Sequence, residues 1–242
     1  MNAQKLVLKA GLIATTVSFL LVGNAMAAVT NGGFAGNSLT GWSKLGDVTT
    51  ASGGAFLTTA SLLDDDFPED AATFNASGTS AYNIGFGGFE AFAGLNAGAL
   101  DSPDFAYEGS LLKQTFNVNS GDTLSFNWNM FTNEGANFTA SADYAFVAIN
   151  GVLTTLATAS NATVASVPYS FSTGASVFSQ TFANASSVTL AFGVVDLGDE
   201  GVTSALWLDN VALTAAVPEP ETYAMLLAGL GFIVASSRRK NV

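Results

Sequence analysis

A strict alternation of apolar and polar residues runs through Asp122–Met130, which reads DTLSFNWNM. Successive side chains of a β-strand point to opposite faces, so Leu124, Phe126, Trp128 and Met130 would share one buried face. The Thr, Ser and Asn residues between them would share the other face. This segment therefore predicts a half-buried strand, and no other feature constrains the fold as strongly.

Three more segments have strand character. Asp143–Thr158 predicts a hairpin, because Asn150 and Gly151 together can adopt the positive φ angles of a tight turn. Residues 186–196 repeat the alternation, and residues 204–214 form a β-branched and aromatic run. Short strands at intervals of about ten residues are typical of β-sandwiches and jelly rolls.

The region from residue 28 to residue 216 shows no persistent helical stripe, no fixed repeat and no linker. We therefore expect one all-β domain there, a jelly roll or β-sandwich. The Gly-rich run Ile84–Gly98 is expected to be a long loop between strands. It is no phosphate loop, because it has no lysine and opens no convincing helix.

Cysteine and histidine are both absent from the 242 residues. Their absence excludes Ser-His-Asp and Cys-His nucleophilic sites, as well as ordinary zinc sites. Haem and iron–sulfur ligation are disfavoured for the same reason. Paired carboxylates that hydrolyse a glycoside are the one catalytic alternative left open. We expect that the protein is not an enzyme.

The region 28–216 is strongly acidic. Lys44 and Lys113 are its only basic residues, against seventeen Asp and Glu, which gives a net charge of −15. Such a surface repels phosphate backbones, so a nucleic-acid partner is excluded. The charge suits solubility outside the cell or the binding of cations.

Residues 1–27 have the pattern of a secretory signal peptide, which we expect to form an N-terminal signal helix. Lys5 and Lys9 precede a short apolar core, and Ala25 and Ala27 form a small-x-small cleavage site. We expect cleavage after Ala27 by the secretion machinery. An uncleaved membrane helix is the alternative.

Residues 217–242 form a second terminal segment. Pro218, Glu219 and Pro220 make a short extended hinge, since proline fixes φ and has no N–H to donate. The stretch Thr222–Ser236 is uncharged and predicts a short transmembrane helix. Its roughly 15 residues reach ~22 Å, less than the ~30 Å hydrocarbon core of a bilayer. The residues that would stop it on the cytoplasmic side are Arg238, Arg239 and Lys240.

A signal peptide at one end, with V-P-E-P, an apolar helix and R-R-K at the other, resembles the PEP-CTERM sorting architecture. The resemblance implies a Gram-negative bacterium that makes exopolysaccharide. It also implies that an exosortase reads Pro218, Glu219 and Pro220 and removes the apolar tail. The precursor would be anchored in the inner membrane transiently, before the body reaches the cell surface or the extracellular matrix. An ordinary C-terminal membrane anchor is the alternative.

The two edges of the central domain are similar to the first and last strands of galactose-binding-type jelly rolls, a frame shared by many carbohydrate-binding modules. In that family an acidic residue after the phenylalanine joins the closing aspartate around a structural calcium. Here Ala35 stands in the first place, while Asp209 is present in the second. The matching positions are Asn31, Gly32, Gly33, Phe34, Leu39, Gly41 and Trp42, then Asp209, Asn210 and Val211.

Two acidic runs, Asp64–Asp70 and Asp196–Gly201, could supply oxygen ligands to calcium or could be solvated loops. Neither run matches the EF-hand loop pattern. We expect structural calcium, if it binds, at Asp209 with Asp196, Asp199 and Glu200.

Aromatic residues supply the candidates for a ligand face. Trp42, Trp128 and Trp207 lie in strand-like sequence and are expected to pack in the core. The other candidates, in loop-like sequence, are Tyr82, Tyr107 and Tyr169.

Two functions follow from these observations. The first is a non-catalytic surface or extracellular-matrix protein that is exported and sorted alongside exopolysaccharide. The alternative is a carbohydrate-binding module that acts as an adhesin or captures glycans.

Overall fold

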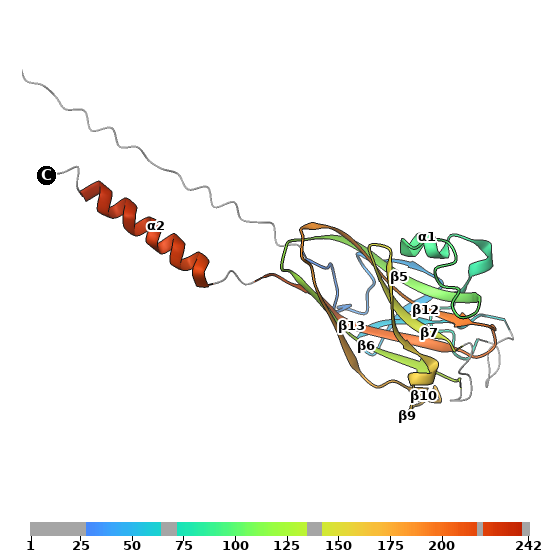
Figure 1. The fold of residues 1–242 in the computed structure, drawn as a ribbon. Coiled ribbons are helices and arrows are strands. Elements are labelled where there is room, and N and C mark those ends of the chain that lie inside the picture. The colour runs from blue at the N-terminus through green and yellow to red at the C-terminus, as the bar shows by residue number, and fades with distance from the viewer. Residues whose placement is uncertain (1–27, 64–71, 135–141, 217–219, 239–242) are drawn as a thin grey trace, which may run out of the picture.

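A computed structural model describes residues 28–63, 72–134, 142–216 and 220–238 of the chain (Figure 1). Two antiparallel sheets pack face to face, and the C-terminal helix follows the last strand. The predicted all-β sandwich is thereby confirmed. The signal-peptide prediction for residues 1–27, including Ala25 and Ala27, lies outside the described residues.

The first sheet has the strand order β1-β5-β12-β7-β8, and the short strand β4 pairs with β5. The long strands β5 and β12 pair along almost their whole length, which makes them the axis of this layer. The bounds are β1 (Ser43–Leu45), β4 (Tyr82–Asn83), β5 (Ala106–Val118), β7 (Tyr144–Ile149), β8 (Val152–Thr158) and β12 (Ser186–Leu197).

The second sheet has the order β2-β3-β13-β6-β10-β9, and β11 also pairs with β6. Its central pair, β6 and β13, has a bulge between Asp209 and Ala212, where Asn210 takes a positive φ of 53°. The bounds are β2 (Asp47–Ala51), β3 (Gly54–Thr58), β6 (Thr123–Thr132), β9 (Val164–Ala165), β10 (Phe171–Ser172), β11 (Ser176–Thr181) and β13 (Ser204–Thr214).

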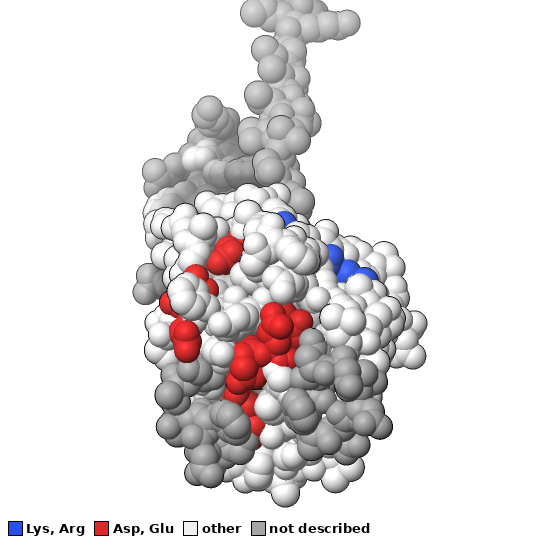
Figure 2. Space-filling model, turned by 90° about the vertical axis from the view of Figure 1, so that its right-hand side faces the viewer, with Lys and Arg blue, Asp and Glu red and all other residues white. Residues whose placement is uncertain are grey.

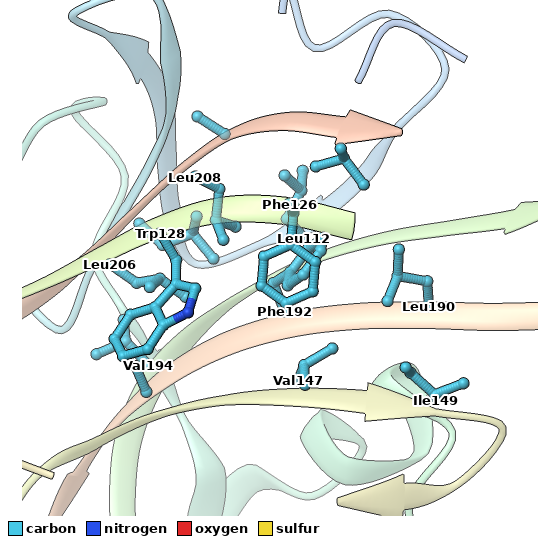
Figure 3. Close-up of a cluster of buried hydrophobic side chains, with 14 of the residues drawn as sticks. Leu112, Phe126, Trp128, Val147, Ile149, Leu190, Phe192, Val194, Leu206 and Leu208 are labelled. Carbon is cyan, nitrogen blue, oxygen red and sulfur yellow. The ribbon is translucent and has the colours of Figure 1, made fainter. Parts of the chain in front are cut away.

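The main hydrophobic core lies between the sheets (Figure 3). Phe192 of β12 packs edge-on against Phe126 of β6, with ring centroids 4.7 Å apart. The alternation in β6 works as predicted, because Leu124, Phe126, Trp128 and Met130 are all buried. Each of these side chains therefore points into the space between the two layers.

The predicted hairpin is β7 and β8, joined by Asn150 and Gly151 with φ of 52° and 78°. Every residue of β7 is buried, although one face of the first sheet points away from the main core. A second apolar cluster covers that outer face. It includes Phe89 of α1 (Phe89–Ala93), which is fully buried.

The Gly-rich run Ile84–Gly98 was expected to be a long loop, and the structure corrects that expectation. It contains η1 (Ile84–Phe86) and the one-turn helix α1. Gly88 and Gly94 flank α1 in the left-handed region, with φ of 91° and 78°. The glycines therefore mark the ends of short helical turns, which cover the first sheet.

The segment Val29–Trp42 consists of turns, although we expected a first strand there, and β1 begins only at Ser43. Asn31, Phe34 and Asn37 take positive φ, which a regular strand does not allow. The segment still reaches the closing strand, because Val211 N–H donates to Gly32 O at 2.9 Å.

Helix α2 (Pro220–Arg238) forms where an apolar helix was predicted, and its described side chains, residues 224–236, are exposed. In the part of the chain that the structure describes, no helix is both long and apolar enough to cross a membrane. Pro218, Glu219, Arg239 and Lys240 lie outside the described residues.

Candidate functional site

A pocket of about 470 Å³ opens on the outer face of the second sheet. We call it the aromatic pocket. Phe56 of β3, Phe131 of β6 and Trp207 of β13 form its floor, and each is half-buried. These residues stand on neighbouring strands and face away from the main core, because their neighbours in sequence point inward.

The side wall of the aromatic pocket is a stack of rings from two loops. Tyr169 lies 5.8 Å from Phe131, 6.3 Å from Phe56 and 4.9 Å from Phe74, measured between ring centroids. Val167, 93% exposed, stands at the rim beside Pro168. The pocket therefore combines a packed aromatic wall with an open mouth.

Trp207 is held in place by its own strand and by the β2–β3 turn. Its indole Nε1 donates to Ala51 O at 3.2 Å. A Cβ added at Gly54 would lie 2.5 Å from Nε1 and 2.3 Å from Leu208 O. Only glycine at position 54 therefore allows the strand to pass beneath the ring. Trp207 is thus a surface-facing aromatic, which corrects its assignment to the core, whereas Trp42 and Trp128 are buried as expected.

A polar side chain accompanies the aromatic floor. Asn129, two residues before Phe131 on β6, also lines the pocket. Its Oδ1 accepts a hydrogen bond from Thr173 Oγ1 at 3.0 Å, which fixes the orientation of the amide. Aromatic faces beside an oriented amide suit a ligand with both apolar faces and hydroxyl groups.

The three tyrosines predicted as a ligand face do not lie together. Tyr82 and Tyr107 belong to strands β4 and β5, not to loops. The Tyr82 hydroxyl donates to Gly87 O at 2.8 Å, and its ring stacks on Phe89. Tyr107 is 40% exposed, while Tyr169 lines the aromatic pocket but is only 3% exposed.

A second candidate site is a group of buried carboxyl groups at one end of the sandwich. We call Glu108, Glu134, Asp143 and Asp196 the acidic cluster. Their exposed fractions are 5%, 2%, 2% and 0%. Asp196 lies opposite Glu108 across the β12–β5 pair, and Glu134 and Asp143 lie just after β6 and just before β7.

Asp143 makes hydrogen bonds to three other residues around this cluster. Its Oδ2 accepts from Ser204 Oγ at 2.6 Å, and its Oδ1 accepts from Leu197 N–H at 3.1 Å. Its backbone N–H donates to Glu134 Oε2 at 3.1 Å. The Asp143 carboxylate therefore ties β12 to β13, and the Asp143 backbone joins them to Glu134 after β6.

The carboxyl of Asp196 adjoins that of Asp143, and each perturbs the pKa of the other. Neither carboxylate oxygen of Asp196 receives a hydrogen bond from a donor in the described residues. The nearby Thr59 hydroxyl lowers the pKa of Asp196 somewhat, yet its own hydrogen bond goes to Ser204 O.

Burial raises the pKa of three acids in this cluster. The pKa of Glu134 rises to about 9, with a further contribution from the charge of Asp143. The pKa of Asp143 rises to about 6, since burial outweighs the hydrogen bonds that favour its charged form. Burial and the neighbouring Asp143 raise the pKa of Asp196 well above its ordinary value.

The predicted calcium ligands are divided between separate places. Asp209 lies at the β13 bulge, where its oxygens accept from Asn210 N–H and Nδ2. Asp199 is exposed and accepts from Gly201 N–H, and Glu200 accepts from Asn83 Nδ2. In the described ranges, no three acidic side chains form a ready-made metal cage. The run Asp64–Asp70 lies outside those ranges.

Comparison with known proteins gives two results. Residues 216–240 match the PEP-CTERM protein-sorting motif, and no curated protein matches the chain. Two solved structures with a similar fold are carbohydrate-binding modules. TmCBM61, in complex with β-1,4-galactotriose, is 9% identical, covers 77% of this chain and 96% of its own, and superposes with a TM-score of 0.37. A CBM4 module is 13% identical, covers 72% and 94%, and has a TM-score of 0.31.

Proposed function

We propose that this chain is a non-catalytic surface or extracellular-matrix protein, exported and then processed by an exosortase in a bacterium that makes exopolysaccharide. The observation that carries the proposal is the sorting motif at residues 216–240. It begins just after β13 ends at Thr214, so processing there would leave both sheets of the sandwich intact.

The processing test changes Pro218, Glu219 and Pro220 together to alanine in cells that contain the sorting enzyme. The variant should accumulate as an inner-membrane precursor, because the enzyme no longer reads the hinge. A matched control changes Ala215 to serine, which alters the residue before the motif and leaves residues 216–240 in place. Normal release of the triple variant would contradict the proposal.

The non-catalytic part of the proposal rests on residue types and on access. The chain has no His or Cys, and the four carboxyl groups of the acidic cluster are buried away from any substrate. The purified exported protein should show no turnover of ester, peptide or glycoside substrates. A hydrolytic rate that one Asp→Asn or Glu→Gln change removes would refute this part.

A second function, capture of saccharide, is favoured by the aromatic pocket. Sugar rings have apolar C–H faces and hydroxyl edges, and the floor of the pocket pairs aromatic faces with the Asn129 amide. The pocket lies on the second sheet and uses residues that follow the strand alternation outward, so a rigid framework positions it. The glycan would be the exopolysaccharide that surrounds the cell.

Affinity electrophoresis in gels that contain the bacterium's own exopolysaccharide tests this second function. The exported protein should be retarded, and Trp207→Ala should restore free migration. Phe86→Ala is the matched control, because Phe86 is 82% exposed and lies outside the pocket. Equal migration of all three proteins, with and without polysaccharide, would eliminate saccharide capture.

A further inference from the structure

Basic side chains are scarce in the domain that holds the acidic cluster. Between residues 28 and 216 the sequence has only Lys44 and Lys113. Lys44 Nζ donates to Val48 O, and Lys113 Nζ lies 4.2 Å from the centre of the Phe92 ring. Figure 2 shows acidic side chains gathered on one end of the sandwich, with the basic ones apart from them.

The lack of a compensating positive charge is clearest at Asp196. This residue is fully buried, neither of its oxygens accepts a hydrogen bond within the described residues, and it adjoins a second carboxyl group at Asp143. A buried charge is strongly unfavourable unless it is paired or coordinates a metal. A cation from solution would offset that charge when the pair is ionised.

We propose that the Asp143–Asp196 pair binds a calcium ion. Asp143 is already oriented by Ser204 Oγ and Leu197 N–H, and the buried carboxyl group of Asp196 adjoins it. The other two acids of the cluster add negative charge around the pair. This site shares Asp196 with the sequence-based expectation, but Asp143 takes the place of Asp209, Asp199 and Glu200.

The chemistry of the donors selects the class of ion. All nearby donors are oxygens, and soft transition metals prefer His and Cys, which the chain lacks. Magnesium keeps several of its waters and demands octahedral geometry, whereas calcium accepts six to eight oxygens in flexible arrangements. A buried pair that must replace much of the hydration shell therefore favours calcium. Since two carboxylates converge rather than three, carbonyl or water oxygens complete the shell.

The proposal is independent of sorting and of saccharide capture, and it is tested on the purified exported protein. Thermal melts at pH 7.5 compare EDTA, calcium and magnesium. A ligand at a hundredfold excess over its Kd should raise the Tm of a domain of this size by about 5–10 °C. We expect that rise with calcium and little with magnesium.

Variants locate the ion. Asp196→Asn and Asp143→Asn should each abolish the calcium-specific rise, while the matched control Asp209→Asn should keep it. In EDTA, Asp196→Asn should melt no lower than the parent protein, because a neutral amide replaces a carboxyl group whose ionisation is opposed by burial and by Asp143. Should an Asn variant fail to fold, calorimetric titration of the parent protein supplies the readout, with one calcium per chain expected.

Three outcomes would overturn the proposal. The first is an equal Tm in EDTA and in calcium at pH 7.5, because the folded protein would then bind no calcium. The second is a calcium rise that survives Asp196→Asn, because the ion would then bind elsewhere. The third is an equal response to magnesium, which would indicate general charge screening.

Discussion

Raising the pH from 5 to 8 in EDTA should lower the Tm of the exported protein through the acidic cluster. The pKa of Asp143 is about 6 in the folded protein and 3.8 in its ordinary state, and that of Glu134 is about 9 rather than 4.5. The folded state therefore binds more protons than the unfolded state across this pH range. Stability is fully present below the unfolded pKa values and is lost as the pH rises through the folded ones.

The size of the fall in Tm follows from the part of each pKa shift that lies above pH 5. For Asp143 that part is roughly one pKa unit, or on the order of 1.4 kcal/mol. For a domain of nearly 190 residues this lowers the Tm by about 3–6 °C. Glu134 acts in the same direction up to pH ~9, so the fall should continue beyond pH 7.

The assay is differential scanning calorimetry at half-unit pH steps, on the parent protein and on Asp143→Asn. The variant cannot ionise at this position, so its Tm should fall less steeply with pH. Asp104→Asn, an exposed acid outside the cluster, is the control and should follow the parent curve. Parallel curves for the parent and Asp143→Asn would refute the reasoning.

Two further predictions concern packing. Phe192→Ala should lower the free energy of unfolding by about 3–5 kcal/mol and the Tm by at least ~6 °C, because Phe192 is fully buried against Trp42 and Phe126. In the same calorimetric assay, the control Val177→Ala, at a 71% exposed position, should change the Tm by less than 2 °C. Gly54→Ala should displace Trp207 and abolish retardation of the protein by the polysaccharide gel. The control Gly33→Ala, where an added Cβ meets open space, should leave the retardation unchanged. Full retardation of Gly54→Ala would count against the pocket geometry.

The strands were predictable where a local pattern alone determines them. The alternation through Leu124–Met130 places one face inward whatever the partner strand, and Asn150-Gly151 specifies a tight turn by itself. The family resemblance predicts a strand at Val29–Trp42, but positive φ at Asn31 and Phe34 breaks any strand there. The resemblance does not indicate these φ angles, so the turns could not be predicted from it.

Both candidate sites depend on which strands are neighbours, which no local pattern reveals. Asp196 was singled out within an acidic run, but Glu108, Glu134 and Asp143 were not. A usable signal existed, because Asp143 and Asp196 each stand at an end of a predicted strand segment. The antiparallel pairing of β12 with β5 and β7 brings Asp143, Asp196 and Glu108 together, and the packing of the two sheets adds Glu134, which follows β6.

The aromatic pocket shows the same limit. Trp207 follows the alternation of β13 outward, yet its aromatic character favoured a core position. Tyr169 lies in a loop, as predicted, but that loop folds back over β6 and buries the ring. Sequence periodicity assigns a face to each side chain and leaves open what covers that face.

The intact mass of the exported protein, purified from cells with an active sorting enzyme, tests the central claim most directly. We predict a chain that begins near Ala28 and lacks the apolar tail. A mass that still includes residues 222–242 would contradict the account.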